Sequence, residues 1–467
     1  MISRRQAILA MGAMPALAAA PAFAARPRAP SLLDDIEGRT FKFFWDLGRD
    51  DNGLFPDRWP SPGPSSIAAV GFALTAYPIG AERGYIGRAQ ARRRTLATLR
   101  FFDSAPQTED PTASAGYRGF FYHFLHLDTG RRYRGTELSS IDSSILFLGM
   151  LYAAAWFDSG HPDEREIRRL ADRIVERADW RWFQRGRGDI SMGWHPGAGF
   201  IDRGWTAYNE GMMAPLLALG ANDRPVDDGA WEAWLATIND FWRGEGGDRH
   251  IAFAPLFGHQ YSHIWYDFRG VNDAANRAAG FDYFENSRRA TYANRAYCVE
   301  NPGGWRGYSA DLWGLTACDG PGAFLTGDGA AQRRIYGYAA RGPLGQPDGL
   351  DDGTIAPTAA LGSLPFAPEI VIPAARAMAA RPGLYDVYGF RDSFNPGLRD
   401  PALALETGTV DAEHGWTATD YLGIDQGPIL AMIANYRREA VWRVMRKVPR
   451  IRKGLRRAGF SGGWLGA

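Results

Sequence analysis

The sequence predicts an all-α fold, an (α/α)6 toroid (barrel), because two kinds of helix alternate along its 467 residues. One kind is amphipathic and rich in arginine, and the other is apolar on nearly every face and rich in small residues. An amphipathic helix buries one stripe, whereas a helix that is apolar on all sides belongs inside a large protein. Strand signals are sparse, so short β-hairpin elements are expected only in loops, as at residues 119–125 with a turn at residues 128–130.

The apolar segments are expected to form an inner ring of parallel helices. They are residues 65–77, 139–157, 206–219, 284–299, 354–364 and 425–434. An outer helix is expected to precede each of them and to return the chain. These outer segments are residues 34–47, 88–104, 162–178, 228–244, 330–340 and 366–380, and a basic stretch at 437–457 is expected to pack as a final outer helix. Because the inner helices share one core, residues 25–467 are predicted to form a single domain.

Residues 1–24 are predicted to be a cleaved twin-arginine signal peptide. Arg4-Arg5 precedes an apolar stretch, and Ala22-Phe23-Ala24 is an A-x-A cleavage site. The alternative is a membrane anchor, but the apolar run is shorter than the roughly 20 residues that a bilayer requires. The twin-arginine route carries folded proteins across a bacterial inner membrane, so we expect a periplasmic or secreted protein with no stable membrane insertion after cleavage.

Composition excludes several classes of protein. Lys+Arg is 53 and Asp+Glu is 52, a balance that argues against nucleic acid as a partner. Two cysteines rule out a disulfide scaffold and a four-thiolate metal cluster, although Cys298 and Cys318 could still pair with each other. His259 and His263 have i,i+4 spacing, but no Glu follows His259, so the zincin pattern is absent. We expect a monomer with no metal and no cofactor.

Acidic residues occur at the N-terminal ends of the expected inner helices. Parallel inner helices place their N-termini around one mouth, where acidic residues ordinarily serve as caps and as partners of the helix dipole. Asp142 and Glu210 fit that role less well, because each is expected about a turn inside an apolar helix. An unpaired charge there is costly, so a raised pKa and a role as proton donor are expected.

Tryptophans in glycine-rich loops lie beside these openings, as in Gly204-Trp205 and Trp313-Gly314. A single Trp is most simply explained by core packing. Several of them near carboxylates indicate a carbohydrate-binding cleft, because sugar rings stack on indoles while their hydroxyls pair with Asp, Glu, Arg and Asn.

The chain resembles the glycoamylase-like domain family, which contains bacterial endo-β-1,2-glucanases and the related region of cyclic β-1,2-glucan synthases. The resemblance extends over nearly all of the mature chain. It rests on residues 43–46, 66–72, 137–142, 208–210, 254–263, 283–288, 313–321 and 352–359.

This resemblance implies an inverting glycoside hydrolase. Inversion requires an acid that protonates the leaving oxygen and a base that activates water on the opposite face of the sugar. Glu210 matches the family's Tyr-Asn-Glu segment and is expected to be the acid, with Asp142 as the first candidate for the base and Glu137 as the second. The remaining candidates are expected to bind substrate: Trp205, Tyr208, His259, His263, Glu285, Arg288, Trp313, Asp319 and Asp352.

The resemblance narrows the expected partner to an oligo- or polysaccharide, β-1,2-glucan, hydrolysed to short oligosaccharides. Starch cleavage of the glucoamylase type is less favoured. Two alternatives stay open. One is a polysaccharide lyase on the same toroid, with Tyr261, His263 or Arg288 in its chemistry. The other is a non-catalytic glucan-binding protein that has kept the cleft.

Overall fold

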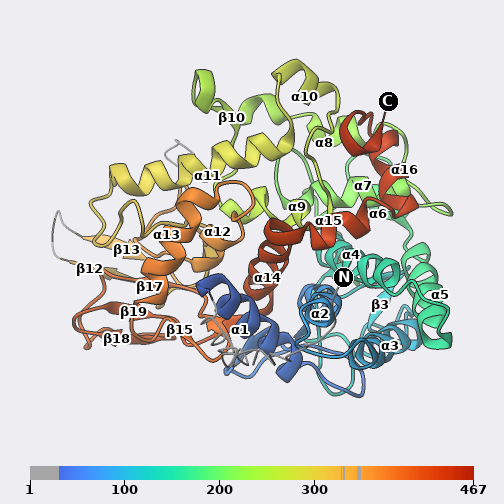
Figure 1. The fold of residues 1–467 in the computed structure, drawn as a ribbon, viewed down its shortest axis with the longest axis horizontal. Coiled ribbons are helices and arrows are strands. Elements are labelled where there is room, and N and C mark those ends of the chain that lie inside the picture. The colour runs from blue at the N-terminus through green and yellow to red at the C-terminus, as the bar shows by residue number, and fades with distance from the viewer. Residues whose placement is uncertain (1–30, 328, 330–331, 344–348, 467) are drawn as a thin grey trace, which may run out of the picture.

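The computed structural model describes residues 31–327, 329, 332–343 and 349–466 (Figure 1). In this part of the chain the fold is predominantly helical with short strands in the loops, as the sequence predicts. The predicted signal peptide at residues 1–24 lies outside the described residues. Among the described helices, none has both the length and the apolar character needed to cross a membrane.

Most of the expected helices are present with bounds close to those predicted. The longer helices are α1 (Leu32–Leu47), α2 (Ile67–Glu82), α3 (Arg88–Ser104), α4 (Ser140–Trp156), α5 (Pro162–Glu176), α7 (Met213–Gly220), α11 (Tyr283–Glu300), α13 (Pro368–Ala379), α14 (Gly423–Arg438) and α16 (Pro449–Arg457). Shorter helices are α6 (Trp180–Gln184), α8 (Ala230–Leu235), α9 (Tyr261–Trp265), α10 (Ala274–Ala279), α12 (Pro357–Leu361) and α15 (Ala440–Met445).

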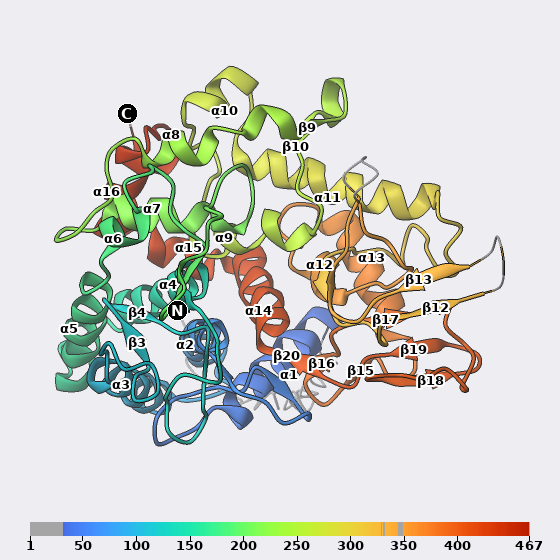
Figure 2. The same ribbon diagram turned by 180° about the vertical axis from the view of Figure 1, so that it is seen from behind.

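The helices α2, α4 and α14 lie at the centre of the molecule, and α2 packs against both of the others. Figures 1 and 2 show these three between α3 and α5 on one side and α11 and α13 on the other. Nearly every side chain of α2 and α4 is buried, because their sequences are apolar on all faces. Ser66 and Ser139 precede these two helices, and each hydroxyl accepts a hydrogen bond from a backbone N–H of the first turn.

The strands are short and all pair antiparallel. The pairs and triplets are β1 (Arg58–Trp59) with β20 (Tyr421–Leu422), β2 (Ser65–Ser66) with β5 (Phe124–Leu125), β3 (Gly116–Tyr117) with β4 (Phe120–Phe121), β6 (Leu138–Ser139) with β7 (Gly193–His195) and β8 (Gly199–Phe200), β9 (Trp242–Arg243) with β10 (His250–Ile251), β11 (Ala317–Cys318) with β14 (Ala339–Ala340), β12 (Phe324–Thr326) with β13 (Arg333–Ile335), β15 (Tyr385–Asp386) with β16 (Gly389–Phe390), and β17 (Phe394–Asn395) with β19 (Gly415–Thr417) and β18 (Thr409–Asp411). The β1–β20 pair joins segments far apart in the sequence, with Arg58 opposite Leu422.

Two predicted outer helices are wrong. Residues 228–244 form only the short α8, a 3₁₀ turn at Ile238–Phe241 and strand β9. Thr237 and the Asn and Asp that follow it favour turns over helix interiors, which explains the break. The described part of residues 330–340 forms β13 and β14, which pair with β12 and β11, so strand pairing overrides a weak helical pattern.

Three inner segments also differ from expectation. Residues 206–219 become helical only from Glu210, because Ala207 has a left-handed φ of 62° and Asn209 caps a 3₁₀ turn at Glu210–Met212 that leads into α7. Residues 354–364 yield only the short α12, which Pro357 begins. The helix α11 has the predicted bounds but buries only one face, which carries polar side chains such as those of Asn286 and Asn294.

The two cysteines are buried and free, so they do not pair. Beside Cys318, a buried ion pair joins two segments of the chain. The Arg341 guanidinium donates to the Cys318 carbonyl at 2.8 Å and to the Asp352 carboxylate at 2.7 Å, and both side chains of this ion pair are fully buried. The contact ties β11 to the segment before α12.

Gly149→Ala tests the contact between α2 and α4. A Cβ atom at Gly149 would lie 2.1 Å from the Gly71 carbonyl oxygen, so the two backbones would have to separate. We expect a loss of about 1–3 kcal/mol in unfolding free energy, the usual cost of overpacking. Gly160→Ala is the control, because its Cβ would meet open space. Equal denaturation midpoints for the two variants would contradict the close contact.

Candidate active site

A cavity of about 430 Å³ lies where several buried helices begin. Ser66 caps α2, Asp142 lies in the first turn of α4, Glu210 begins the turn that leads into α7, and Ile424 lies in the first turn of α14. The openings of these helices therefore meet at one site. The lining residues are Asp57, Arg58, Ser66, His123, Phe124, Ile141, Asp142, Ile145, Glu210, Phe257, Tyr261, Ala317, Tyr338, Leu422 and Ile424.

Asp142 is held at the cavity by the cap of α4. The Ser139 hydroxyl accepts a hydrogen bond from the Asp142 N–H at 3.1 Å and donates one to Asp142 Oδ2 at 2.6 Å. The sequence pattern placed Asp142 about a turn inside its helix, but it lies in the first turn and takes part in the cap. This contact holds one carboxylate oxygen in place.

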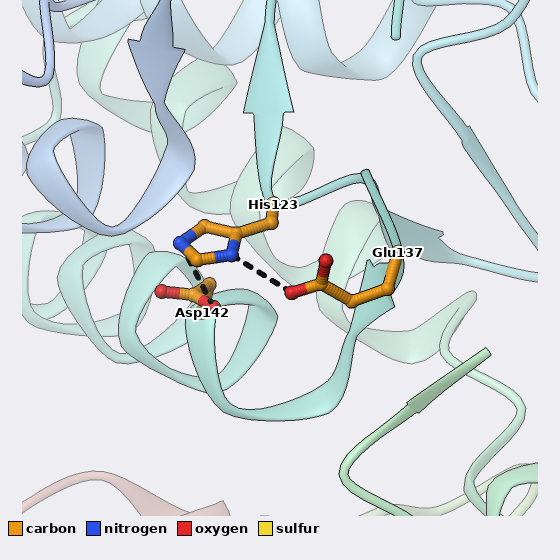
Figure 3. A group of neighbouring side chains, drawn as sticks. All are labelled: His123, Glu137 and Asp142. Carbon is orange, nitrogen blue, oxygen red and sulfur yellow. Dashed lines mark hydrogen bonds and ion pairs between the residues drawn. The ribbon is translucent and has the colours of Figure 1, made fainter. Parts of the chain in front are cut away.

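His123 lies between two predicted catalytic carboxylates (Figure 3). Its Nδ1 is 2.8 Å from Glu137 Oε1, its Nε2 is 3.6 Å from Asp142 Oδ2, and its ring stacks on Phe124 with centroids 3.9 Å apart. Burial alone would lower the pKa of His123, but the charges of Asp142 and Glu137 outweigh that effect and raise the pKa to about 9. At neutral pH the ring is therefore an imidazolium, with Nδ1 donating to Glu137.

The same three side chains have a spacing that would admit a metal ion. His123, Glu137 and Asp142 each offer one ligand atom, and these atoms all lie within 4.8 Å of one another. The sequence predicts no metal. Nδ1 and Oε1 are already in direct hydrogen-bond contact at 2.8 Å, so the arrangement is that of a cation between two carboxylates.

Glu210 is the carboxyl group best suited to donate a proton. Its Oε2 is buried and has no hydrogen-bond partner within the described chain. Burial raises the pKa of Glu210 to about 7, and the nearby charge of Asp142 adds to the effect, against the opposing influence of a backbone hydrogen bond. A large fraction of this group is thus a neutral acid near pH 7, as a general acid requires.

Arg58 forms a second charged group in the cavity wall. Its Nη1 lies 2.8 Å from Asp319 Oδ2 and 3.5 Å from Asp420 Oδ2, and its Nε lies 3.3 Å from Asp57 Oδ2. Asp57 and Arg58 line the cavity, whereas Asp319 and Asp420 are buried. Asp319, a predicted substrate ligand, is therefore bound to Arg58 and is not among the lining residues.

Asp392 and Asp425 form a buried pair next to Asp319. Asp392 Oδ2 accepts a hydrogen bond from the Asp319 N–H at 2.6 Å, and the buried Asp392 and Asp425 carboxyls share a side-chain hydrogen bond with each other. Burial raises the pKa of both carboxyls, and the charge of Asp319 adds to the effect on Asp392, as that of Asp392 does on Asp425. The pair therefore retains a proton at neutral pH.

Three predicted substrate ligands lie in the core instead. The Tyr208 hydroxyl lies 3.1 Å from His263 Nε2 and 3.0 Å from the Ser287 hydroxyl, and its ring stacks on His259. His259 Nε2 accepts a hydrogen bond from the Phe253 N–H at 3.1 Å. Burial lowers the pKa of both histidines, that of His263 to about 3, so they are neutral. Tyr208, His259 and His263 are each about 1% exposed and cannot reach a sugar in this structure.

The other predicted ligands are also absent from the cavity lining. The Trp205 indole N–H donates to the Ser140 hydroxyl at 2.9 Å beneath the start of α4, and Trp313 is fully buried. Asp352 belongs to the buried ion pair with Arg341. Glu285 and Arg288 lie on the partly exposed face of α11 in ion pairs that include Arg289 and Glu369.

The aromatic side chains that do line the cavity are Phe and Tyr. Phe124, Phe257, Tyr261 and Tyr338 replace the expected tryptophans, and Tyr338 is 62% exposed. Neither His123 nor the Asp57-Arg58 pair was identified from the sequence. His123 lies between the two-residue strands β4 and β5, which have no periodic pattern that would single it out.

Comparison with known proteins adds a family and several relatives. Residues 202–449, a segment that includes Glu210, match the family described as "Putative glucoamylase". A protein of Parabacteroides distasonis, described as an exo beta-1,2-glucooligosaccharide sophorohydrolase (non-reducing end), is 26% identical over 91% of this chain. The chain spans 57% of that relative's length.

Solved structures are similar over nearly the whole chain. A putative glucoamylase from Bacteroides uniformis has a TM-score of 0.78 and 30% identity, over 94% of this chain and 99% of that one. An endo-beta-1,2-glucanase from Chitinophaga pinensis, solved with sophorotriose and glucose, has a TM-score of 0.78 and 25% identity, over 93% and 100% of the two chains.

Asp392→Asn tests the buried acid pair. A carboxyl whose pKa is raised on folding contributes stability below its unfolded pKa of about 3.9 and loses it as pH rises through the folded value. The wild-type Tm should therefore fall between about pH 4 and pH 7, the folded pKa of Asp392. The variant keeps the shape without the charge and should fall less. A Tm difference between the two that stays constant with pH would contradict a raised pKa.

Proposed function

The chain belongs to the family described as "Putative glucoamylase", and this membership confirms the resemblance drawn from its motifs. From it we propose that the protein is a glycoside hydrolase that cleaves β-1,2-linked glucan into short oligosaccharides. One observation carries this proposal: Glu210, whose pKa is raised by burial to about 7, lines the same cavity as the Asp142 carboxyl group. Relatives described as acting on β-1,2-linked glucose oligomers or glucan support the choice of linkage.

In the proposed reaction Glu210 protonates the oxygen of the leaving sugar. Asp142, or Glu137 as second candidate, accepts a proton from the water that attacks the anomeric carbon from the opposite face. Bond cleavage and attack then invert the configuration. Oε2 of Glu210 suits this role, because no hydrogen bond within the described chain competes for its proton. Arg58 and Tyr338 are suited to contact the sugar's hydroxyls and its ring face.

We further propose that the helices form an (α/α)6 toroid around this cavity within a single, monomeric domain. The convergence of α2, α4, α7 and α14 at one mouth supports it. The lyase alternative is less well supported, because of its three candidate residues only Tyr261 lines the cavity.

The substrate is tested by incubating the purified protein with linear and cyclic β-1,2-glucans and, in parallel, with starch. We expect short oligosaccharides from β-1,2-glucan, and the first products should be α-anomers in proton NMR before mutarotation. A β-anomer would contradict inversion, and activity on starch alone would contradict the substrate. Unsaturated products that absorb in the ultraviolet would indicate a lyase. Binding of the glucan without release of reducing ends would indicate a glucan-binding protein.

Glu210→Gln tests the acid. The amide keeps the shape of the side chain but has no proton to give, so kcat should fall by at least roughly 10²–10⁴-fold. Thermal stability should be nearly unchanged. In the wild type, kcat should decline as pH rises through about 7, where Glu210 loses its proton. Near-normal turnover by the variant would remove Glu210 from this role.

Export is also a proposal. If residues 1–24 are a twin-arginine signal, replacing Arg4 and Arg5 with lysine should leave the precursor in the cytoplasm. Cell fractionation with an antibody to the mature chain measures this. Unchanged maturation and periplasmic recovery in the double variant would exclude the twin-arginine route.

A further inference from the structure

The two oxygens of Asp142 have different surroundings. Oδ2 accepts the Ser139 hydroxyl at 2.6 Å and lies 3.6 Å from His123 Nε2. Oδ1 has no hydrogen-bond partner within the described chain, and Asp142 lines the cavity. The free oxygen is thus the one available to a molecule bound there, and rotation of the carboxylate would exchange the two.

His123 is itself restrained on several sides. Nδ1 is hydrogen-bonded to Glu137 at 2.8 Å, and the ring lies flat against Phe124 at an interplanar angle of 15°. The backbone is tied as well: the His123 N–H donates to the Glu137 carbonyl at 3.0 Å, and the His123 carbonyl accepts from the Ile67 N–H at 3.3 Å. The ring therefore has a fixed position beside the Asp142 carboxylate.

Charges around the ring favour its cationic form. The acidic groups that face it are Glu137 before β6, Asp142 on α4 and Asp57 before β1. Arg58 lines the same cavity, where it is paired with Asp57 and Asp319. These three carboxylates outweigh the burial of the ring and raise its pKa to about 9.

We propose that His123 is a positioning residue: lying between Glu137 and Asp142, it holds the Asp142 carboxylate so that Oδ1 is presented to the cavity. This rests on the proposed function only in that Asp142 serves the reaction. Without the ring the carboxylate keeps its Ser139 contact but gains freedom to rotate. Turnover should then suffer more than substrate binding, because a misplaced base is costly only once the reaction begins.

The geometry is tested by NMR titration of the imidazoles, which requires no activity. The His123 signal is identified by its loss in His123→Gln. We expect it to stay doubly protonated through about pH 8, and its pKa to fall in Asp142→Asn and in Glu137→Gln. A pKa near the usual 6.5, unmoved by either change, would overturn the proposal. Stoichiometric Zn²⁺ binding that displaces the ring proton would also overturn the proposal, because the three side chains would then form a metal site.

Kinetics near pH 6, where Glu210 is protonated, tests the role. We expect kcat of His123→Gln on β-1,2-glucan to fall by roughly 10²-fold with KM changed only a few-fold. His126→Gln is the matched control, because His126 is exposed, contacts the Tyr133 ring and does not line the cavity that holds Asp142.

His123→Asn is a second variant for the case in which the Gln variant fails to fold, judged by its Tm. Unchanged kcat in folded His123 variants would overturn the positioning role. An inactive wild type would refute the proposed function and with it the kinetic role, while the NMR titration would still decide whether His123 holds Asp142.

Discussion

Buried helices that begin at one place must satisfy their first backbone N–H groups there, and the rest of the site depends on how they do so. Ser66, Ser139 and Asn209 each supply a side-chain acceptor to the first turn of the helix or 3₁₀ turn that they precede. The same caps decide where the next acidic residues lie. Asp142 is held by the hydroxyl that caps its own helix, and Glu210 follows directly after Asn209. A requirement of folding thus places two carboxyl groups at one cavity.

Once there, the two carboxyls meet different surroundings, and their chemistry diverges. Glu210 has a buried oxygen without a partner and lies near the charge of Asp142, so it tends to keep its proton. Asp142 accepts a hydrogen bond from the Ser139 hydroxyl and faces the cationic His123 ring. A carboxyl that keeps its proton, with a second carboxyl held in place at the same cavity, is the arrangement that a general acid and a separate base require.

The central helices could be predicted because their composition leaves them no solvent-facing side, as in α2 and α4. The cavity carboxyls could be predicted because they stand at helix starts. His123 and Arg58 were missed, since they lie in or beside two-residue strands that have no periodic pattern. Tyr208 and His263 were misassigned for another reason: a polar side chain buried in a hydrogen-bond network and one lining a cleft look alike in sequence. Their partners come from distant segments, such as Ser287 on α11.

The pairing of β1 with β20 has a consequence for when the site can exist. Arg58 and Leu422 lie opposite each other in this two-stranded contact, and both line the cavity. The wall therefore joins a segment that is made early on the ribosome to one that is made more than 360 residues later. A nascent chain that ends before Leu422 lacks part of that wall, however well its earlier helices have folded. The cavity is thus complete only once Leu422 and Ile424 have been made, and a product truncated before them would carry Glu210 and Asp142 without an enclosed site.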